Sequence, residues 1–204
     1  MTPSFVGIAL LASLLGAVPF GLIVTRILGQ DDPRQAGSGN IGATNVLRTS
    51  GWLPGLLTLA GDILKGMAAV AIIPGLISAP PGNPYGGEIA AAAAVLGHMY
   101  SPFTGFQGGK GVATGLGVFV LMLPGPTAWA AAVFAASVAA TKYVSLGSIL
   151  AALTVPLAGL LLGYPSGSNG VAALISALII WRHQANIGRL LRGKENRFGS
   201  PKKE

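Results

Sequence analysis

The chain has 204 residues, of which 51% are hydrophobic and only 9% are charged. Because a soluble domain carries about 25% charged residues, this composition indicates that lipid is the main solvent. The absence of cysteine excludes a disulfide framework, a thiolate nucleophile and a cysteine-ligated metal site. The formal net charge is +7, and the basic residues lie between apolar runs of the sequence. This distribution favours anionic lipid or phosphate over nucleic acid as the partner.

Apolar segments recur along the whole chain, and about 20 such residues suffice for a helix to cross the hydrocarbon core. The 31 glycines fit this environment, since small residues let membrane helices pack closely. We predict an all-α polytopic integral membrane protein with seven transmembrane helices, at Phe5–Ile27, Leu53–Ala79, Gly87–Phe106, Gly111–Leu123, Thr127–Ala140, Leu146–Gly163 and Gly170–Trp181. The fourth and fifth spans are short, so five or six crossings with kinked or re-entrant segments are the alternative.

The basic residues orient these spans, because short cytoplasmic loops are enriched in Lys and Arg. With the N-terminus outside, every Lys and Arg except Lys65 lies inside: Arg26, Arg34, Arg48, Lys110, Lys142, Arg182, Arg189, Arg192, Lys194, Arg197, Lys202 and Lys203. The outside connections contain neither residue type: Pro80–Gly86, Pro124–Pro126 and Tyr164–Asn169. We therefore predict a cytoplasmic C-terminus and a single membrane domain over residues 1–204, with a short polar cytoplasmic tail from about residue 193. The opening residues lack the basic region of a signal peptide, so we expect the first span to be retained.

The first inside loop reads GSGNIGATNVLRTSG over residues 37–51. Its glycines allow backbone amides to turn toward an anion, and its hydroxyl and amide side chains add neutral donors beside one guanidinium. A phosphate cradle would use Ser38, Gly39, Asn40, Gly42, Thr44, Asn45 and Arg48. The alternative is a flexible loop followed by a helix cap.

The second inside segment, residues 98–114, places Gly108, Gly109 and Lys110 just before an apolar helix. Helix N-terminal amides together with a lysine commonly bind phosphate, whereas the alternative is a solvated lysine that follows the positive-inside rule. We expect His98, at the start of this segment, to be a structural histidine.

Two further polar segments lie on the inside. Ser145 and Ser148 share one helix face, although such hydroxyls often bond only to their own backbone. His183, Asn186 and Arg189 recur every three residues as the last helix leaves the membrane, where a basic stripe for lipid headgroups is the alternative.

Asp62 and Lys65 lie three residues apart inside the second predicted span. Charges there usually face a partner or a cavity, so we expect a structural ion pair. An intramembrane acid can also mark a proton or ion path, which keeps a small transporter or channel as a rival function.

The chemistry available excludes several mechanisms. Neither His98 nor His183 is followed five positions later by an aspartate that could orient it as a general base. The two histidines and six acids are scattered, so we predict neither a metal site nor a cofactor. Neutral donors and cations on one membrane face instead suit the binding of phosphates and the stabilisation of an oxyanion.

Four collinear stretches, GSGNIGATNVLRTSG, GHMYSPFTGFQGGKGVATGLG, KYVSLGSI and HQANIGRLLRGKENRF, together resemble the acyl-phosphate:glycerol-3-phosphate acyltransferases, the PlsY family. The resemblance covers residues 37 to 198 and departs from the family pattern at Pro102 and Gln107. It implies a seven-helix enzyme of the bacterial inner membrane, with its active site facing the cytoplasm. The enzyme would transfer an acyl group from fatty acyl phosphate to the 1-hydroxyl of glycerol 3-phosphate, releasing inorganic phosphate and lysophosphatidic acid.

By matching position, the resemblance also implies the residues that act: Ser38, Asn40, Arg48, Lys110, Ser148, His183 and Asn186. Arg48, Lys110, His183 and Asn186 would hold the glycerol phosphate, while Ser38, Asn40 and the amides near Gly108 and Gly109 would receive the acyl phosphate. An acyl phosphate carries a good leaving group, so positioning two anions is the main task and no strong protein base is required. A nonenzymatic lipid-binding scaffold is a third possible function, and it would tolerate loss of Lys110 or Arg48.

Overall fold

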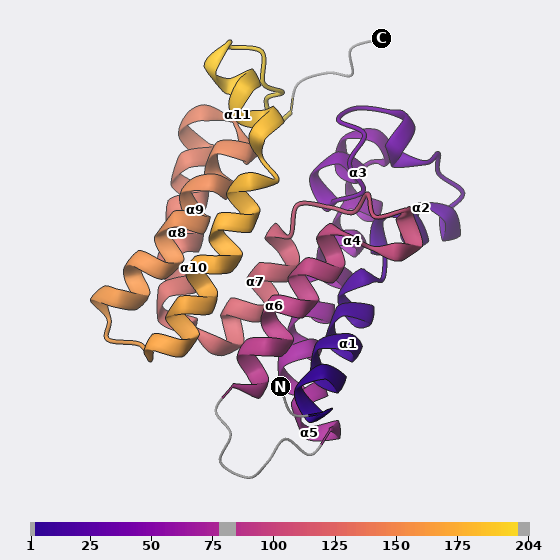
Figure 1. The fold of residues 1–204 in the computed structure, drawn as a ribbon. Coiled ribbons are helices and arrows are strands. Elements are labelled where there is room, and N and C mark those ends of the chain that lie inside the picture. The colour runs from indigo at the N-terminus through magenta and orange to yellow at the C-terminus, as the bar shows by residue number, and fades with distance from the viewer. Residues whose placement is uncertain (1–2, 78–84, 200–204) are drawn as a thin grey trace. The chain divides into compact units, whose positions relative to one another are not determined.

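The computed structural model describes residues 3–77 and 85–199, and their regular structure is helical throughout (Figure 1). The chain forms two compact units, Met1–Leu121 and Met122–Glu204, and each is described by itself. The single membrane domain expected from the sequence stays a prediction. Ser78, Ala79, the outside residues 80–84, Lys202 and Lys203 lie outside the described residues.

Unit 1 is built from the helices of the first four predicted spans. They are α1 (Pro3–Ala17), α2 (Phe20–Ile27), α3 (Ala43–Ser50), α4 (Trp52–Ala71), α5 (Ile73–Leu76), α6 (Gly86–Met99) and α7 (Val112–Met122), with short 3-10 turns at Pro33–Gln35 (η1) and Pro102–Thr104 (η2). The first predicted span is interrupted between α1 and α2, because Pro19 has no N–H to donate and its ring obstructs a continuous helix. The C-terminal end of the third predicted span was placed too late in the chain, since α6 ends at Met99 and residues 100–111 form a loop that includes η2.

Glycine permits the close packing of helices in unit 1. A Cβ at Gly16 would collide with the carbonyl oxygen of Ala94, and one at Gly97 would collide with that of Ser13. The backbones of α1 and α6 therefore touch, as expected for membrane helices whose interfaces consist of small residues. A core cluster of apolar residues joins these two helices to α4 and α5: Ile8, Ala12, Ala69, Ile73, Ala90 and Ala94.

Unit 2 contains the helices of the last three predicted spans, α8 (Pro124–Thr141), α9 (Val144–Leu161) and α10 (Ser166–Trp181), followed by the short α11 (Gln184–Leu191). Helices α8 and α9 form a hairpin that turns at Lys142, a residue in the left-handed conformation with φ of 63°. Gly147 lets α9 approach Phe134 and Val138 of α8. The turn of this hairpin lies at the end of the unit at which α11 lies (Figure 1), and Ser145 is the second residue of α9.

Three helical segments among the described residues are long and apolar enough to cross a membrane: Ser4–Ile27, Trp52–Ala71 and Val144–Leu161. Large apolar side chains on them face outward, including Leu10, Leu56 and Leu161, which is 77% exposed. Such exposure is costly in water and natural in lipid. Every predicted span contains a helix, whereas the count of seven crossings and their orientation stay predictions.

Candidate active site

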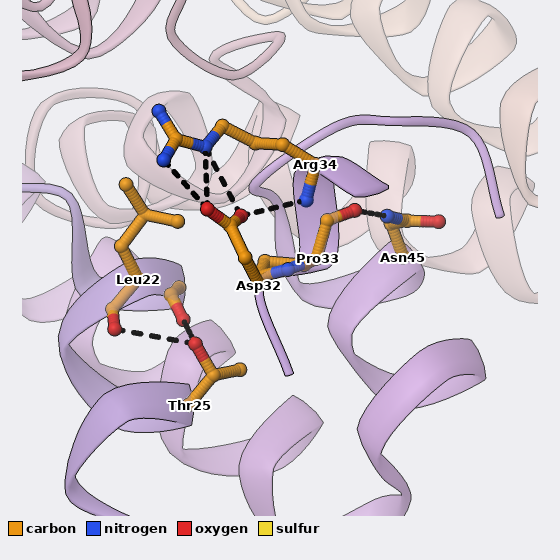
Figure 2. A network of polar contacts seen from close by, with 7 residues as sticks. Leu22, Thr25, Asp32, Pro33, Arg34 and Asn45 are labelled. Atoms are coloured by element: carbon orange, nitrogen blue, oxygen red, sulfur yellow. Dashed lines mark hydrogen bonds and ion pairs between the residues drawn. The ribbon is translucent and has the colours of Figure 1, made fainter. Parts of the chain in front are cut away.

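Asn45 organises the loop that precedes α3 from the first turn of that helix (Figure 2). Its side chain is buried, and its Nδ2 donates hydrogen bonds to three carbonyl oxygens, those of Pro33 at 2.8 Å, Ala36 at 3.2 Å and Asn40 at 2.9 Å. Its Oδ1 accepts from the backbone N–H of Ser38 at 2.8 Å. The sequence placed Asn45 among the phosphate donors; in the structure its amide holds the loop, and its role toward phosphate stays a prediction.

The other candidate residues of this segment are more exposed than Asn45. Ser38, Gly39 and Thr44 are exposed, while Asn40, Gly42 and Arg48 are half-buried. Asn40 Oδ1 accepts from the N–H of Gly42 at 2.9 Å, which tightens the turn into α3. Ser38 and Arg48 can therefore reach a ligand from a loop whose shape is already set.

An ion pair lies at the entry to this loop (Figure 2). The Arg34 guanidinium donates to both carboxylate oxygens of Asp32, at distances down to 2.6 Å, and the Arg34 N–H also donates to Asp32. These hydrogen bonds and the charge of Arg34 hold the pKa of Asp32 below its ordinary value. The two charges offset each other where η1 begins.

Asn45→Asp is expected to disrupt the loop while conserving side-chain volume. The carboxylate would still accept from Ser38, but its second oxygen would face three carbonyls in place of a donor. Each unsatisfied buried group costs about 1–3 kcal/mol, so we expect a lower unfolding temperature and at least a tenfold loss of activity, as an order-of-magnitude figure. Thr49→Ala is the matched control, because the Thr49 hydroxyl contacts the carbonyls of Asn45 and Val46 and the Ser50 hydroxyl, all within α3. Equal unfolding temperatures for Asn45→Asp and wild type would contradict this role.

The segment that carries Gly108, Gly109 and Lys110 is a compact loop between α6 and α7. The N–H groups of Gly108 and Gly109 donate to the carbonyls of Met99 and His98, both at 3.1 Å. A Cβ at Gly108 would collide with the carbonyl oxygen of His98, and one at Gly109 with the imidazole of His98. Both glycines are buried, while Lys110 is half-buried just before α7. The two amides thus shape the turn that presents Lys110, and their role toward acyl phosphate stays a prediction.

In unit 2, His183 and Ser148 are both buried. His183 Nδ1 lies 2.7 Å from the carbonyl oxygen of Ile179. Since a carbonyl only accepts, this contact places the proton on Nδ1, which makes Nε2 the acceptor of the neutral ring. Ser148 donates to the carbonyl of Val144 within its own helix at 2.9 Å, as the alternative interpretation of this hydroxyl anticipated.

Glu195 gathers the polar side chains at the end of unit 2. Its carboxylate accepts from Ser145 Oγ at 2.9 Å, from Asn186 Nδ2 at 2.6 Å and from Arg189 Nε at 2.6 Å. Asn186 and Arg189 therefore do share one face, as their spacing predicted. Glu195 was not singled out in the sequence, although it stands among the basic residues of the tail, where Glu204 is the other acid.

The polar tail also folds back onto the start of α9. The N–H of Phe198 donates to the carbonyl of Lys142 at 2.7 Å, and Arg197 Nε lies 3.3 Å from the Tyr143 hydroxyl. The tail is thus a clasp that carries Glu195 to Ser145.

The clasp should weaken in acid. Burial raises the pKa of Glu195, but hydrogen bonds from Asn186, Arg189 and Ser145, with the charge of Arg189, outweigh it and hold the pKa below its ordinary value of 4.5. A lowered pKa means that the ionised carboxylate stabilises the folded state above about pH 4.5, and that this stability is lost as the pH falls through the folded pKa. We expect Glu195→Gln to unfold at a lower temperature than wild type near neutral pH and to converge with it in acid. A difference that stays constant with pH would contradict this.

The candidate residues fall into two groups. In unit 1, two loops lie at the end where α2 and α6 finish (Figure 1). They are the loop before α3 that Asn45 holds, called the Asn45 loop, and residues 100–111 between α6 and α7, called the Lys110 loop. In unit 2, Glu195 joins the third and fourth segments directly. Among the described residues, no group of three or more His, Cys, Asp or Glu side chains is arranged to hold a metal ion.

Comparison with known proteins identifies relatives along nearly the whole chain. The family model described as glycerol-3-phosphate acyltransferase matches residues 6–193. Relatives described as glycerol-3-phosphate acyltransferases include those of Syntrophotalea carbinolica, 46% identical with 96% of this chain and 98% of the relative covered, and Geobacter sulfurreducens, 46% identical with 92% and 94% covered. Crystal structures of PlsY, an integral membrane glycerol 3-phosphate acyltransferase, match in the glycerol 3-phosphate form with a TM-score of 0.86 and in the lysophosphatidic acid form with 0.84, both at 41% identity over 96% of each chain.

Proposed function

Because the chain belongs to the glycerol-3-phosphate acyltransferase family of integral membrane proteins, we propose that it acylates the 1-hydroxyl of glycerol 3-phosphate with fatty acyl phosphate as donor. The products are lysophosphatidic acid and inorganic phosphate. The observation that carries the proposal is the loop built on Asn45, which fixes the backbone at Ser38 and leads into the helix that carries Arg48. Such a loop suits anion binding, which is what this reaction requires most.

Two substrate anions repel each other, so cations must offset their charges before the hydroxyl can approach the acyl carbon. Arg48 offers a planar guanidinium that can bind a phosphate with two hydrogen bonds, and Lys110 supplies a compact charge. Ser38 and Asn40 supply neutral donors for the acyl phosphate. In this assignment, the phosphate-binding groups named here come from two loop regions of unit 1, one with Ser38, Asn40 and Arg48 and the other with Lys110.

Unit 2, taken by itself, carries candidate groups that suit a glycerol hydroxyl. With the proton on Nδ1, His183 Nε2 can accept a hydrogen bond from a glycerol hydroxyl. Asn186 has its amide nitrogen turned toward Glu195, which directs the amide oxygen away from that carboxylate. Ser148, whose hydroxyl bonds Val144, shapes the same end of the unit.

The transfer proceeds by direct attack. The glycerol 1-hydroxyl adds to the acyl carbon, a phosphate oxygen of the substrate takes its proton, and inorganic phosphate leaves with the electrons of the broken C–O bond. No serine is acylated in this sequence. Mass spectrometry of the intact protein during turnover is expected to show no mass increase, and an acyl-serine adduct that forms and decays at the turnover rate would contradict the direct route.

An acyl tail needs an apolar path beside these polar groups. An open groove of about 410 Å³ runs along α1 and α6, lined by Val6, Ala9, Leu10, Ser13, Ala93 and Leu96. Its lining suits a hydrocarbon chain entering from the bilayer, and α6 leads toward the Lys110 loop.

The experiment that tests the function follows product formation. Protein reconstituted in lipid receives labelled glycerol 3-phosphate with fatty acyl phosphate, and the lipid extract is separated by chromatography. Labelled lysophosphatidic acid is the expected product. The transporter alternative predicts uptake of labelled solute into vesicles with no lipid product. It is weakened because Asp62 and Lys65, the charges that suggested an ion path, pair with each other.

For its location, we propose a multi-pass protein of the bacterial inner membrane with the site on the cytoplasmic face. The proposal depends on the distribution of Lys and Arg, which are concentrated in the connections that carry the candidate residues. Labelling of single introduced cysteines by an impermeant reagent tests it, since Thr44→Cys should react only from the cytoplasmic side. Reaction from the opposite side would reverse the orientation.

A further inference from the structure

Three ionisable side chains that the proposed reaction does not use are buried together in unit 1. They are Asp62 and Lys65 of α4 and His98 of α6, and none is more than 4% exposed. Lys65 Nζ lies 2.7 Å from Asp62 Oδ1, which confirms the expected ion pair, and His98 Nδ1 lies 3.5 Å from the same oxygen. Burying charged groups is costly, so ionisable side chains inside a membrane protein usually have a structural or functional role.

One part of the cluster has a plain structural partner. Lys65 Nζ donates to the carbonyl oxygen of Val18 at 2.8 Å, in the break between α1 and α2. That break is made by Pro19 and leaves carbonyls without partners in a regular helix ladder. Lys65 therefore secures the break, and Ser101 does the same by donating to Ala17 at 2.6 Å.

His98 has a different second neighbour. On the side away from Asp62, its Nε2 faces Gly109 so closely that no Cβ could be accommodated there. The His98 carbonyl also accepts from the N–H of Gly109 at 3.1 Å. The ring is thus held between a carboxylate in α4 and the backbone of the residue that immediately precedes Lys110.

We propose that His98 is a positioning residue for Lys110, with Asp62 orienting the imidazole and the imidazole setting the backbone at Gly109. The inference rests on the proposed phosphate-binding role of Lys110. Carboxylates orient histidines in the same way at metal sites, where loss of the partner typically costs about 10–100-fold in affinity or activity. A loss of that order is expected here.

Two variants separate positioning from folding. His98→Gln keeps the Asp62–Lys65 pair but removes the ring, whereas Asp62→Asn combined with Lys65→Met removes both charges without leaving either one buried alone. Thr58→Val is the matched control, because Thr58 lies on α4, is fully buried and bonds only the carbonyl of Pro54 within that helix. Unfolding temperatures of all variants are measured first, in the same lipid.

The decisive measurement is a cycle with Lys110→Ala. If His98 acts through Lys110, His98→Gln lowers kcat/KM for glycerol 3-phosphate about 10–100-fold in the wild-type background and less than about twofold in the Lys110→Ala background. The Thr58→Val control leaves both backgrounds unchanged. Equal losses in the two backgrounds, or no loss in folded His98→Gln, would overturn the proposal.

A second readout does not depend on activity. Hydrogen exchange of the peptide that covers residues 100–111 should accelerate in His98→Gln and in the charge-free double variant. Without an oriented ring against Gly109, the hydrogen bonds from the Gly108 and Gly109 amides to the carbonyls of Met99 and His98 should open more often. Unchanged exchange would sink the proposal even where activity falls. If wild type itself forms no lysophosphatidic acid, the proposed function fails instead, and that result is distinguished by the wild-type assay alone.

Discussion

Lys110→Ala is expected to lower the rate of acyl transfer by more than about 10²-fold, by analogy with the loss of a single preorganised transition-state donor. Lys110 is half-buried at the end of a loop whose preceding amides are tied to Met99 and His98, so its charge is held in place before substrate arrives. Alanine removes the charge without adding or removing a backbone group. The rate of phosphate release at saturating substrates measures the loss.

The control for Lys110→Ala is Lys194→Ala, which removes an exposed cation from the tail. Both variants change the net charge equally, so any difference between them reports on position. Lys110→Arg should recover part of the rate, because the charge returns with a different shape. Activity of Lys110→Ala within about threefold of wild type would support the lipid-binding scaffold instead, on the ground that a required preorganised donor costs far more.

Gly108→Ala is expected to cost about 10²-fold, since a displacement of about 1 Å in a positioned group can cause a loss of this size. The new Cβ would collide with the His98 carbonyl oxygen, a backbone atom that cannot move without displacing the end of α6. The loop must therefore shift and carry Lys110 with it.

Gly170→Ala is the matched control for Gly108→Ala. Gly170 lies within α10, and a Cβ there would meet nothing within 4 Å beyond its chain neighbours and the backbone of its own helix. Alanine also favours a helix more than glycine does, so this variant should be as stable as wild type or more so. Full activity in folded Gly108→Ala would show that the loop adapts without cost.

Apolar stretches in the sequence were sufficient to predict a helix in each span, but not the short helices α3 and α11, which lie outside the spans. The ends of the helices were harder to place, because they depend on local chemistry: Pro19 interrupts the first span, and the Pro- and Gly-containing loop after Met99 ends α6 early. The Asp62–Lys65 pair was predictable because residues three apart share a helix face. Its link to His98 was not, since it requires knowing that α6 packs beside α4.

The polar segments of the candidate site were found in the sequence, but the division of labour within them was not. Asn45 has the same side-chain chemistry as Asn40, and only the path of the loop makes one a scaffold and leaves the other partly exposed. Glu195 contacts Ser145 across 50 positions in the chain, a separation that no local pattern reveals. Contacts of this kind are set by tertiary structure.

The most direct test of the proposed reaction measures inorganic phosphate released by the purified wild-type protein in lipid. Fatty acyl phosphate and glycerol 3-phosphate are supplied together and separately, and acyl-CoA replaces the donor in a parallel reaction. Phosphate release that requires both substrates, matches the lysophosphatidic acid formed and does not occur with acyl-CoA is the predicted result. No turnover in folded protein, or equal transfer from acyl-CoA, would contradict it.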